Sequence, residues 1–186
     1  MNTIKDITNL IFIGKNMDEL SHYDLLIINA DWAEEQLAKD LKIMLDRNII
    51  DKDTLLIICD SHQPDYGRST AKILVDYLKK ENINNKIIID NKYISNPEIL
   101  KNIDKLVNVN DYTRILRIAK EFVARRWYMN AKQHNFPIDK CDFYGVVDGR
   151  NISKDDWYKT EDAINQVMKE LINIGKLTID GELSIK

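Results

Sequence analysis

Cysteine, proline and glycine are all scarce in this sequence. Its 186 residues include two cysteines, three prolines and six glycines. Cys59 and Cys141 lie far apart and form no CxxC or Cys/His spacing. A disulfide framework and a zinc-binding module are therefore excluded as the basis of the fold, and we expect two reduced thiols and no metal site. No linker, low-complexity tract or internal repeat divides the chain.

The sequence also lacks any cluster of charges of one sign. The 27 basic and 30 acidic residues are interspersed, with a net charge of −3 and no long run of either sign. Binding to nucleic acid or to an anionic membrane surface is therefore not predicted. The longest apolar runs, such as 25–30, are too short to span a bilayer, and the N-terminal residues lack the cleavage site of a signal peptide. We expect a cytoplasmic protein without a membrane span.

What the sequence does contain is a regular alternation of buried strands and amphipathic helices. Short, predominantly apolar segments predict strands at residues 24–29, 54–59, 86–89, 114–119 and 142–147. Helical segments lie between them, a short helix is predicted over 3–12, and a last helix over about 160–174. This order is typical of a parallel sheet covered on both faces. We expect one α/β domain over 1–186, Rossmann-like and doubly wound, with three layers and about five strands.

Residue types that are preferred at helix ends predict where several helices begin or end. Asp31 and Ser69 are candidate N-caps of the helices after the first and second strands, and Ser153 is a candidate for the last helix. Pro97 suits the first turn of a helix, where its missing N–H costs nothing. Gly175 lies where a C-terminal cap of the last helix is expected, with the apolar stripe over 163–172 packed on the sheet.

The predicted strand order 3-2-1-4-5 places a ligand crevice beyond the ends of the first and fourth strands. Asp31 then lies opposite Lys120, and Arg125 and Arg126 open the helix that follows. Cationic side chains and helix N-termini both attract anions. Neighbouring residues of a helix point about 100° apart, so we expect only one of the two arginines to face the crevice.

Two interpretations of these cations remain open. Lys120 and Arg126 either hold an anionic ligand or neutralise carboxylates of the protein itself. Asp31, Asp60 and Glu121 are the carboxylates expected nearest to them.

Three polar residues beside this crevice also have two interpretations each. His62, near Asp60 and Asp65, suits a general base or a metal ligand, although a lone histidine in a polar loop is more often solvated. Ser95 and Asn96 suit hydrogen bonding to a ligand, and equally suit capping of the helix that follows.

Three short motifs resemble the YdcF-like family of bacterial proteins, which includes the SanA and ElyC envelope proteins. The first is the strand, turn and Arg-Arg pair over 115–128, the second is Ser95-Asn96, and the third is Asp156-Trp157-Tyr158-Lys159-Thr160-Glu161. The resemblance implies a Rossmann-like domain and, for some members, binding of S-adenosylmethionine or a nucleotide. The family's glycine turns after the first two strands are replaced here by sequences containing Asp31 and Asp60.

Three functions follow as hypotheses. The first is a small-molecule-binding protein with an anionic or nucleotide-like ligand at the crevice. The second is a hydrolase or transferase that uses His62 and Asp60. The third is a non-catalytic interaction protein whose ligand site has degenerated, as the missing glycines suggest.

Overall fold

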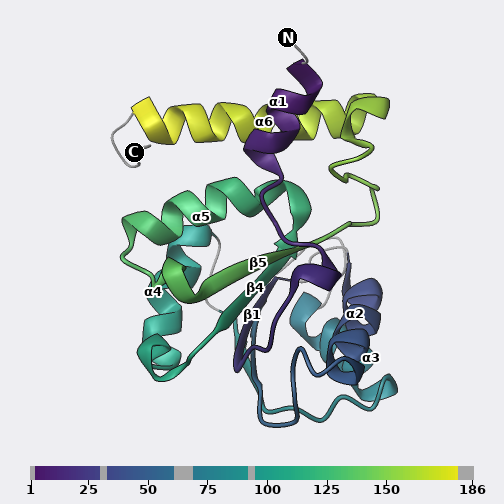
Figure 1. The fold of residues 1–186 in the computed structure, drawn as a ribbon, viewed down its shortest axis with the longest axis vertical. Helices are drawn as coiled ribbons and strands as arrows, with labels where there is room; N and C mark the ends of the chain where they lie inside the picture. Colours follow the sequence, from purple (N-terminus) through teal and green to yellow (C-terminus); the bar gives the residue numbers. More distant parts are fainter. Residues whose placement is uncertain (1–2, 30–32, 61–68, 92–94, 180–186) are drawn as a thin grey trace.

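The sheet has five parallel strands in the order β3-β2-β1-β4-β5 (Figure 1). A computed structural model describes residues 3–29, 33–60, 69–91 and 95–179. The strands are β1 Leu25–Asn29, β2 Leu55–Cys59, β3 Ile87–Asp90, β4 Ile115–Lys120 and β5 Cys141–Val146. The predicted doubly wound, Rossmann-like α/β fold and its strand order are confirmed.

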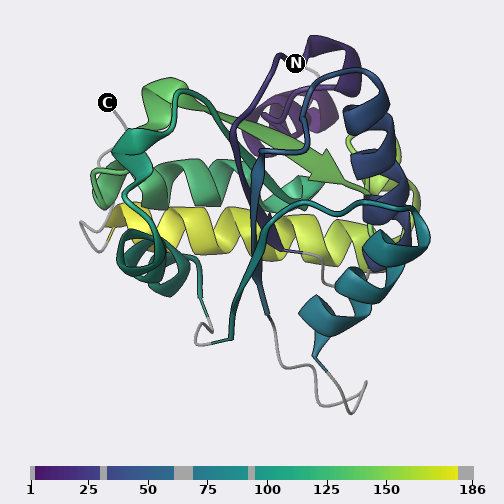
Figure 2. The same ribbon diagram turned by 90° about the horizontal axis from the view of Figure 1, so that it is seen from below.

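Six α-helices complete the described chain. They are α1 Thr3–Ile11, α2 Glu34–Asp46, α3 Thr70–Lys80, α4 Asn96–Leu106, α5 Ala124–Gln133 and α6 Glu161–Ile179. Helices α2 and α3 lie together on one side of the sheet, and α4 and α5 lie on the other (Figures 1 and 2). Within the described residues, no helix combines the length and the apolar character needed to cross a membrane.

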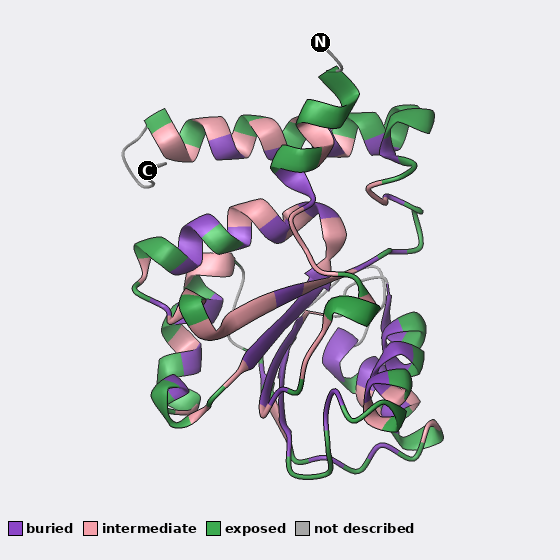
Figure 3. Cartoon of the chain, in the orientation of Figure 1, coloured by how far each residue is buried: buried purple, intermediate pink, exposed green. Residues whose placement is uncertain are grey.

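Strands β1 and β2 are apolar along nearly their whole length because helices cover both of their faces. Leu26 and Ile28 of β1 belong to the core on the α2 and α3 side, whereas Leu25 and Ile27 belong to the core on the α4 and α5 side. The central strands are accordingly buried along their length (Figure 3). Cys59 is buried in the second of these cores, and both cysteines are free thiols.

Helix α6 packs in a place that the sequence did not predict. Its main helical neighbours are α1 and α5, so it lies outside the sheet layers (Figure 1). Ala163, Val167 and Ile174 join a third core with residues of α1 and α5, whereas Ile172 of the expected stripe is 57% exposed. Direct packing of the 163–172 stripe on the sheet was therefore wrong. The helix instead turns the face centred on 163, 167, 170 and 174 inward.

The predicted helix ends are partly correct. The Ser69 hydroxyl accepts a hydrogen bond from the Lys72 N–H at 3.1 Å, so Ser69 caps α3 as expected. Ser153 does not begin α6, because the 3-10 turn η6 (Trp157–Lys159) separates them. Gly175 does not end α6 either, since the helix continues to Ile179 while Ile174 and Leu177 pack in the third core. Asp31 lies outside the described residues.

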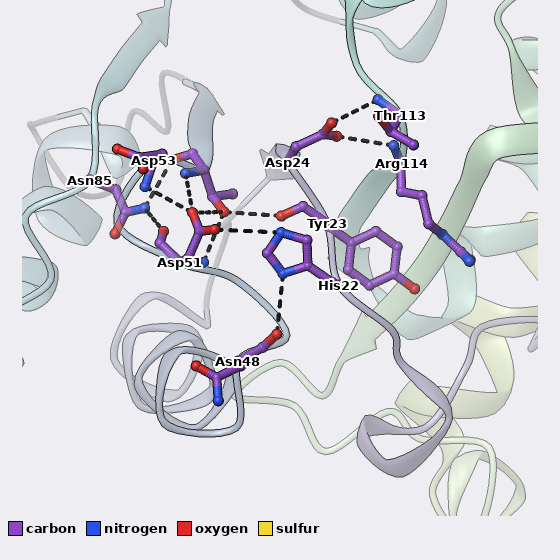
Figure 4. A network of polar contacts seen from close by, with 10 residues as sticks. His22, Tyr23, Asp24, Asn48, Asp51, Asp53, Asn85, Thr113 and Arg114 are labelled. Atoms are coloured by element: carbon purple, nitrogen blue, oxygen red, sulfur yellow. Dashed lines mark hydrogen bonds and ion pairs between the residues drawn. The ribbon is translucent and has the colours of Figure 1, made fainter.

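The edge of the sheet where the strands begin is joined by a polar network (Figure 4). The Asp24 carboxylate accepts the backbone N–H groups of Thr113 at 2.7 Å and Arg114 at 3.0 Å. The Thr54 hydroxyl donates to the Tyr23 carbonyl at 3.0 Å. These bonds connect the segments that lead into β1, β2 and β4, which satisfies buried polar groups at this edge.

Candidate functional site

A cavity of about 300 Å³ lies at the opposite edge, where β1 and β4 end. Its described lining comes from β1, β4, the N-termini of α4 and α5, the segment after β5, and α6. Its cationic side chains are Arg117, Lys120, Arg126 and Arg150. Glu170 is the one carboxylate among the described lining residues. The crevice expected from the strand order is therefore present, and its described lining has more cationic than anionic side chains.

Arg126 forms a two-pronged ion pair with Glu170 of α6. Its Nε donates to Oε2 at 2.6 Å, and its Nη2 donates to Oε1 at 3.1 Å. The Arg126 side chain is 26% exposed, whereas the Glu170 side chain is only 4% exposed. The sequence had suggested Asp31, Asp60 or Glu121 as internal partners. Glu170 was missed, although a charged residue on the otherwise apolar inner face of a helix is a recognisable signal.

Arg125 points elsewhere. Its Nε donates to the carbonyl of Leu10 in α1 at 2.8 Å, and the residue does not line the cavity. The structure therefore brings Lys120 and Arg126 together and leaves Arg125 outside, as the angle between neighbouring helix positions implied.

Glu121 also turns to a different partner. One of its oxygens accepts the Lys154 N–H at 3.0 Å, and burial raises the pKa of its carboxyl group. The carboxylate is thus occupied by the backbone of the segment that leads to α6.

Arg117 is a cavity residue that the sequence interpretation missed. It lies in the middle of β4 and is 1% exposed. Its Nη1 donates to the carbonyls of Ile27 at 3.0 Å and Ile118 at 3.2 Å, and its Nη2 donates to the side-chain oxygen of Asn29. Its guanidinium lies 5.8 Å from the ring centre of Trp127. These contacts offset the cost of burying a charge and place it in the cavity wall. A lone arginine inside an apolar strand was the available signal.

Arg150, in the segment after β5, is a second cavity residue that the sequence interpretation missed. Its Nε and Nη2 donate to Oδ2 of Asp148 at 3.0 Å and 2.5 Å, and its backbone N–H donates to Oδ1 at 3.0 Å. The Asp148 side chain is completely buried. The Arg150 guanidinium also lies 5.5 Å from the ring centre of Phe122. An exposed arginine is thereby held in one position. No feature of the sequence distinguishes it from other surface arginines.

Ser95 and Asn96 line the cavity from the N-terminus of α4. Ser95 is the cap residue, but its hydroxyl donates to the Glu98 carboxylate at 2.8 Å and makes no capping bond. Asn96 is the first helical residue, and Pro97 lies in the first turn as expected. The polar side chains of Ser95 and Asn96 therefore lie where they can reach a ligand in the cavity.

Asp60 does not line this cavity. Its Oδ1 accepts hydrogen bonds from the Thr70 hydroxyl at 3.1 Å and from the Ala71 N–H at 3.0 Å. Asp60 therefore ties the end of β2 to the first turn of α3. His62 lies outside the described residues. Across the part of the chain that the structure describes, no group of three or more histidine, cysteine, aspartate or glutamate side chains is arranged to hold a metal ion.

Comparison with known proteins adds no family or relative to this geometry. No family model, curated protein or solved structure matches the chain. The YdcF-like affiliation suggested by three short motifs stays a prediction.

Proposed function

We propose that the protein binds a small anionic ligand, a carboxylate or a phosphate, in the cavity at the ends of β1 and β4. One observation carries the proposal: four cationic side chains and one carboxylate make up the charged part of the described lining. Arginine does not lose its proton in proteins, so most of this charge persists at any physiological pH. Clefts lined by one sign of charge concentrate ligands of the opposite sign.

The cavity also limits the class of anion. Its volume of about 300 Å³ is at the lower end of the range for small-molecule sites. The resemblance to YdcF-like proteins suggests S-adenosylmethionine or a nucleotide. S-adenosylmethionine carries a sulfonium cation, which four cationic side chains would repel. A phosphate ester, including a small nucleotide, or a carboxylate suits the charges better.

Thermal-shift titration tests the proposal, because a ligand that binds only the native state raises its stability. We expect inorganic phosphate or AMP to raise the melting temperature, and S-adenosylmethionine to raise it less. Lys120→Gln should reduce the shift. Lys132→Gln is the matched control, since Lys132 is an exposed lysine on the last turn of α5, about 12 Å along the helix from its start. Equal shifts in both variants, or no shift with any anion, would contradict the proposal.

The Arg126–Glu170 pair supports a second candidate function. The Glu170 carboxylate already accepts hydrogen bonds from the Nε and Nη2 of Arg126. Such an internal pair is expected for an interaction protein with a degenerate ligand site. Such a protein would show no stabilisation by any anion in the same titration. For the hydrolase or transferase hypothesis, Asp60 is engaged by α3 and lies away from the cavity lining, so that hypothesis gains no support.

A further inference from the structure

The two edges of the sheet differ in how they are covered. At the β5 edge, the backbone N–H of Lys15 donates to the carbonyl of Phe143 at 2.8 Å, and Lys15 forms a β-bridge with Tyr144. A segment of the same chain thus runs along β5. At the other edge, β3 pairs with β2, and no described segment pairs with the outer side of β3. Such an edge offers backbone N–H and C=O groups to another chain.

The ladder between β2 and β3 shows which backbone groups of β3 point outward. The carbonyls of Lys86 and Asp90 accept backbone N–H groups from β2 and the residue after it, at 3.0 Å and 2.7 Å. Because every second residue of a strand faces the same neighbouring strand, the backbone groups of Ile88 face β2 as well. The N–H and C=O groups of Ile87 and Ile89 therefore point away from the sheet.

The side chains of β3 leave this edge unprotected. Natural proteins guard edge strands with a charge, a proline or a bulge. The central residues of β3 are three consecutive isoleucines instead, and none of them is buried. Ile89 is 40% exposed. Contact with a second apolar edge would remove this surface from water.

The sequence of this edge is complementary to itself. Residues 85–91 read Asn-Lys-Ile-Ile-Ile-Asp-Asn, a pattern that is symmetric about Ile88 except that the two charges are opposite. Two copies paired antiparallel about Ile88 would place each Lys86 opposite an Asp90, and each Ile87 opposite an Ile89. Opposite charges and apolar pairs across strands stabilise a sheet, whereas a parallel pair in register would place like charges side by side.

We propose that β3 is an interaction surface for a second copy of this chain, paired antiparallel across a two-fold axis at Ile88. Ile87 of each copy would exchange backbone hydrogen bonds with Ile89 of the other, as the outward direction of their N–H and C=O groups allows. One continuous sheet would then run through both copies. The Asp90 side chain is 4% exposed, so the exposed Lys86 would approach its charge while the carboxylate keeps its buried position.

Sedimentation velocity over a range of protein concentrations tests the proposal. We expect a reversible dimer at micromolar concentrations, because small interfaces are typical of weak association. Ile89→Lys should weaken dimerisation about tenfold or more, since it places a charge in the isoleucine contact. Ile43→Lys is the matched control, because Ile43 of α2 is 41% exposed and lies outside β3. Circular dichroism of both variants checks that they remain folded.

Cysteine variants test the register independently. In the proposed pair, the two Ile88 residues face each other without mutual hydrogen bonds, with their Cα atoms about 4.5 Å apart. This separation suits a disulfide, so Ile88→Cys should give a cross-linked dimer under mild oxidation. Ile89→Cys is the control. Each Ile89 lies opposite an Ile87, so two cysteines at position 89 would be more than about 7 Å apart, too far for a disulfide.

A chain that stays monomeric at every concentration would overturn the proposal. A dimer that Ile89→Lys leaves intact would also overturn it, because the chain would then associate through another surface. The same holds for a dimer in which Ile88→Cys cross-links no better than Ile89→Cys. None of these results bears on anion binding, since no residue of β3 belongs to the described lining of the cavity.

Discussion

Arg126 of α5 and Glu170 of α6 join the last helix to the wall of the cavity. Their two hydrogen bonds, at 2.6 Å and 3.1 Å, connect residues 44 positions apart, and the Glu170 side chain is 4% exposed. A carboxylate buried to this degree depends on its partner, because water cannot replace the lost contact. Arg126 therefore has a structural role whether or not the cavity binds a ligand.

Arg126→Ala should destabilise the protein strongly. It leaves the Glu170 carboxylate buried without its partner, a change that typically costs about 3–5 kcal/mol. Because Arg126 is partly exposed, we expect a value near the lower end of this range. Urea denaturation would measure the loss in the free energy of unfolding.

Two further variants test the explanation. Replacing both partners, as in Arg126→Met/Glu170→Met, should restore most of the stability, since no buried charge remains. Lys42→Ala breaks an exposed pair with Asp46 and should cost only about 0–1 kcal/mol. A mild effect of Arg126→Ala would show that Glu170 is not dependent on this arginine.

Two glycines should respond to alanine in opposite directions. A Cβ on Gly145 would lie 2.8 Å from the Glu121 Cα, a backbone atom that cannot move aside, so Gly145→Ala should cost about 1–3 kcal/mol. Nothing lies within 4 Å of a Cβ on Gly175, which is inside α6. Gly175→Ala should therefore stabilise by about 0.5–1 kcal/mol. Thermal melts of both variants check this, and a destabilised Gly175→Ala would contradict the position of Gly175 within the helix.

Asp142 should make the stability depend on acid pH. Burial acts to raise the pKa of its carboxyl group, but hydrogen bonds from Lys15, Tyr23 and Arg114 outweigh it and lower the pKa. Its stabilisation is thus complete above the unfolded-state pKa of about 4 and is lost as the pH falls through the lower folded-state value. Asp142→Asn should cost about 1–3 kcal/mol at pH 7, and this difference should shrink below about pH 4.

Chemical denaturation of both proteins between pH 3 and pH 7 would measure the difference. Asp139→Asn is a control, because Asp139 is exposed near the start of β5. A difference that stays constant over the whole pH range would show that the network does not depend on the Asp142 charge.

The sequence alone determined the architecture, because strand order and layers follow from local patterns. Continuous apolar segments are expected wherever helices cover both faces of a sheet, and residues 25–28, 55–59 and 87–89 of the first three strands carry this pattern. Arg117 interrupts it in β4, and Asp142 interrupts it in β5. The strand order then placed the crevice at the ends of β1 and β4, where the cavity lies. Lys120 and Arg126 were identified for the same reason: Lys120 ends β4, and Arg126 lies in the first turn of the helix that follows it.

Only the tertiary structure decided which distant residues complete the cavity. Arg150 and Glu170 come from segments after β5, and their positions depend on how α6 packs against α1 and α5. That packing follows from a third core, to which residues more than 150 positions apart contribute, such as Ile11 and Val167. Ion pairs between residues so distant leave no periodic pattern in a sequence. The partner of Arg126 was therefore fixed by the packing of helices, and not by its neighbours in the chain.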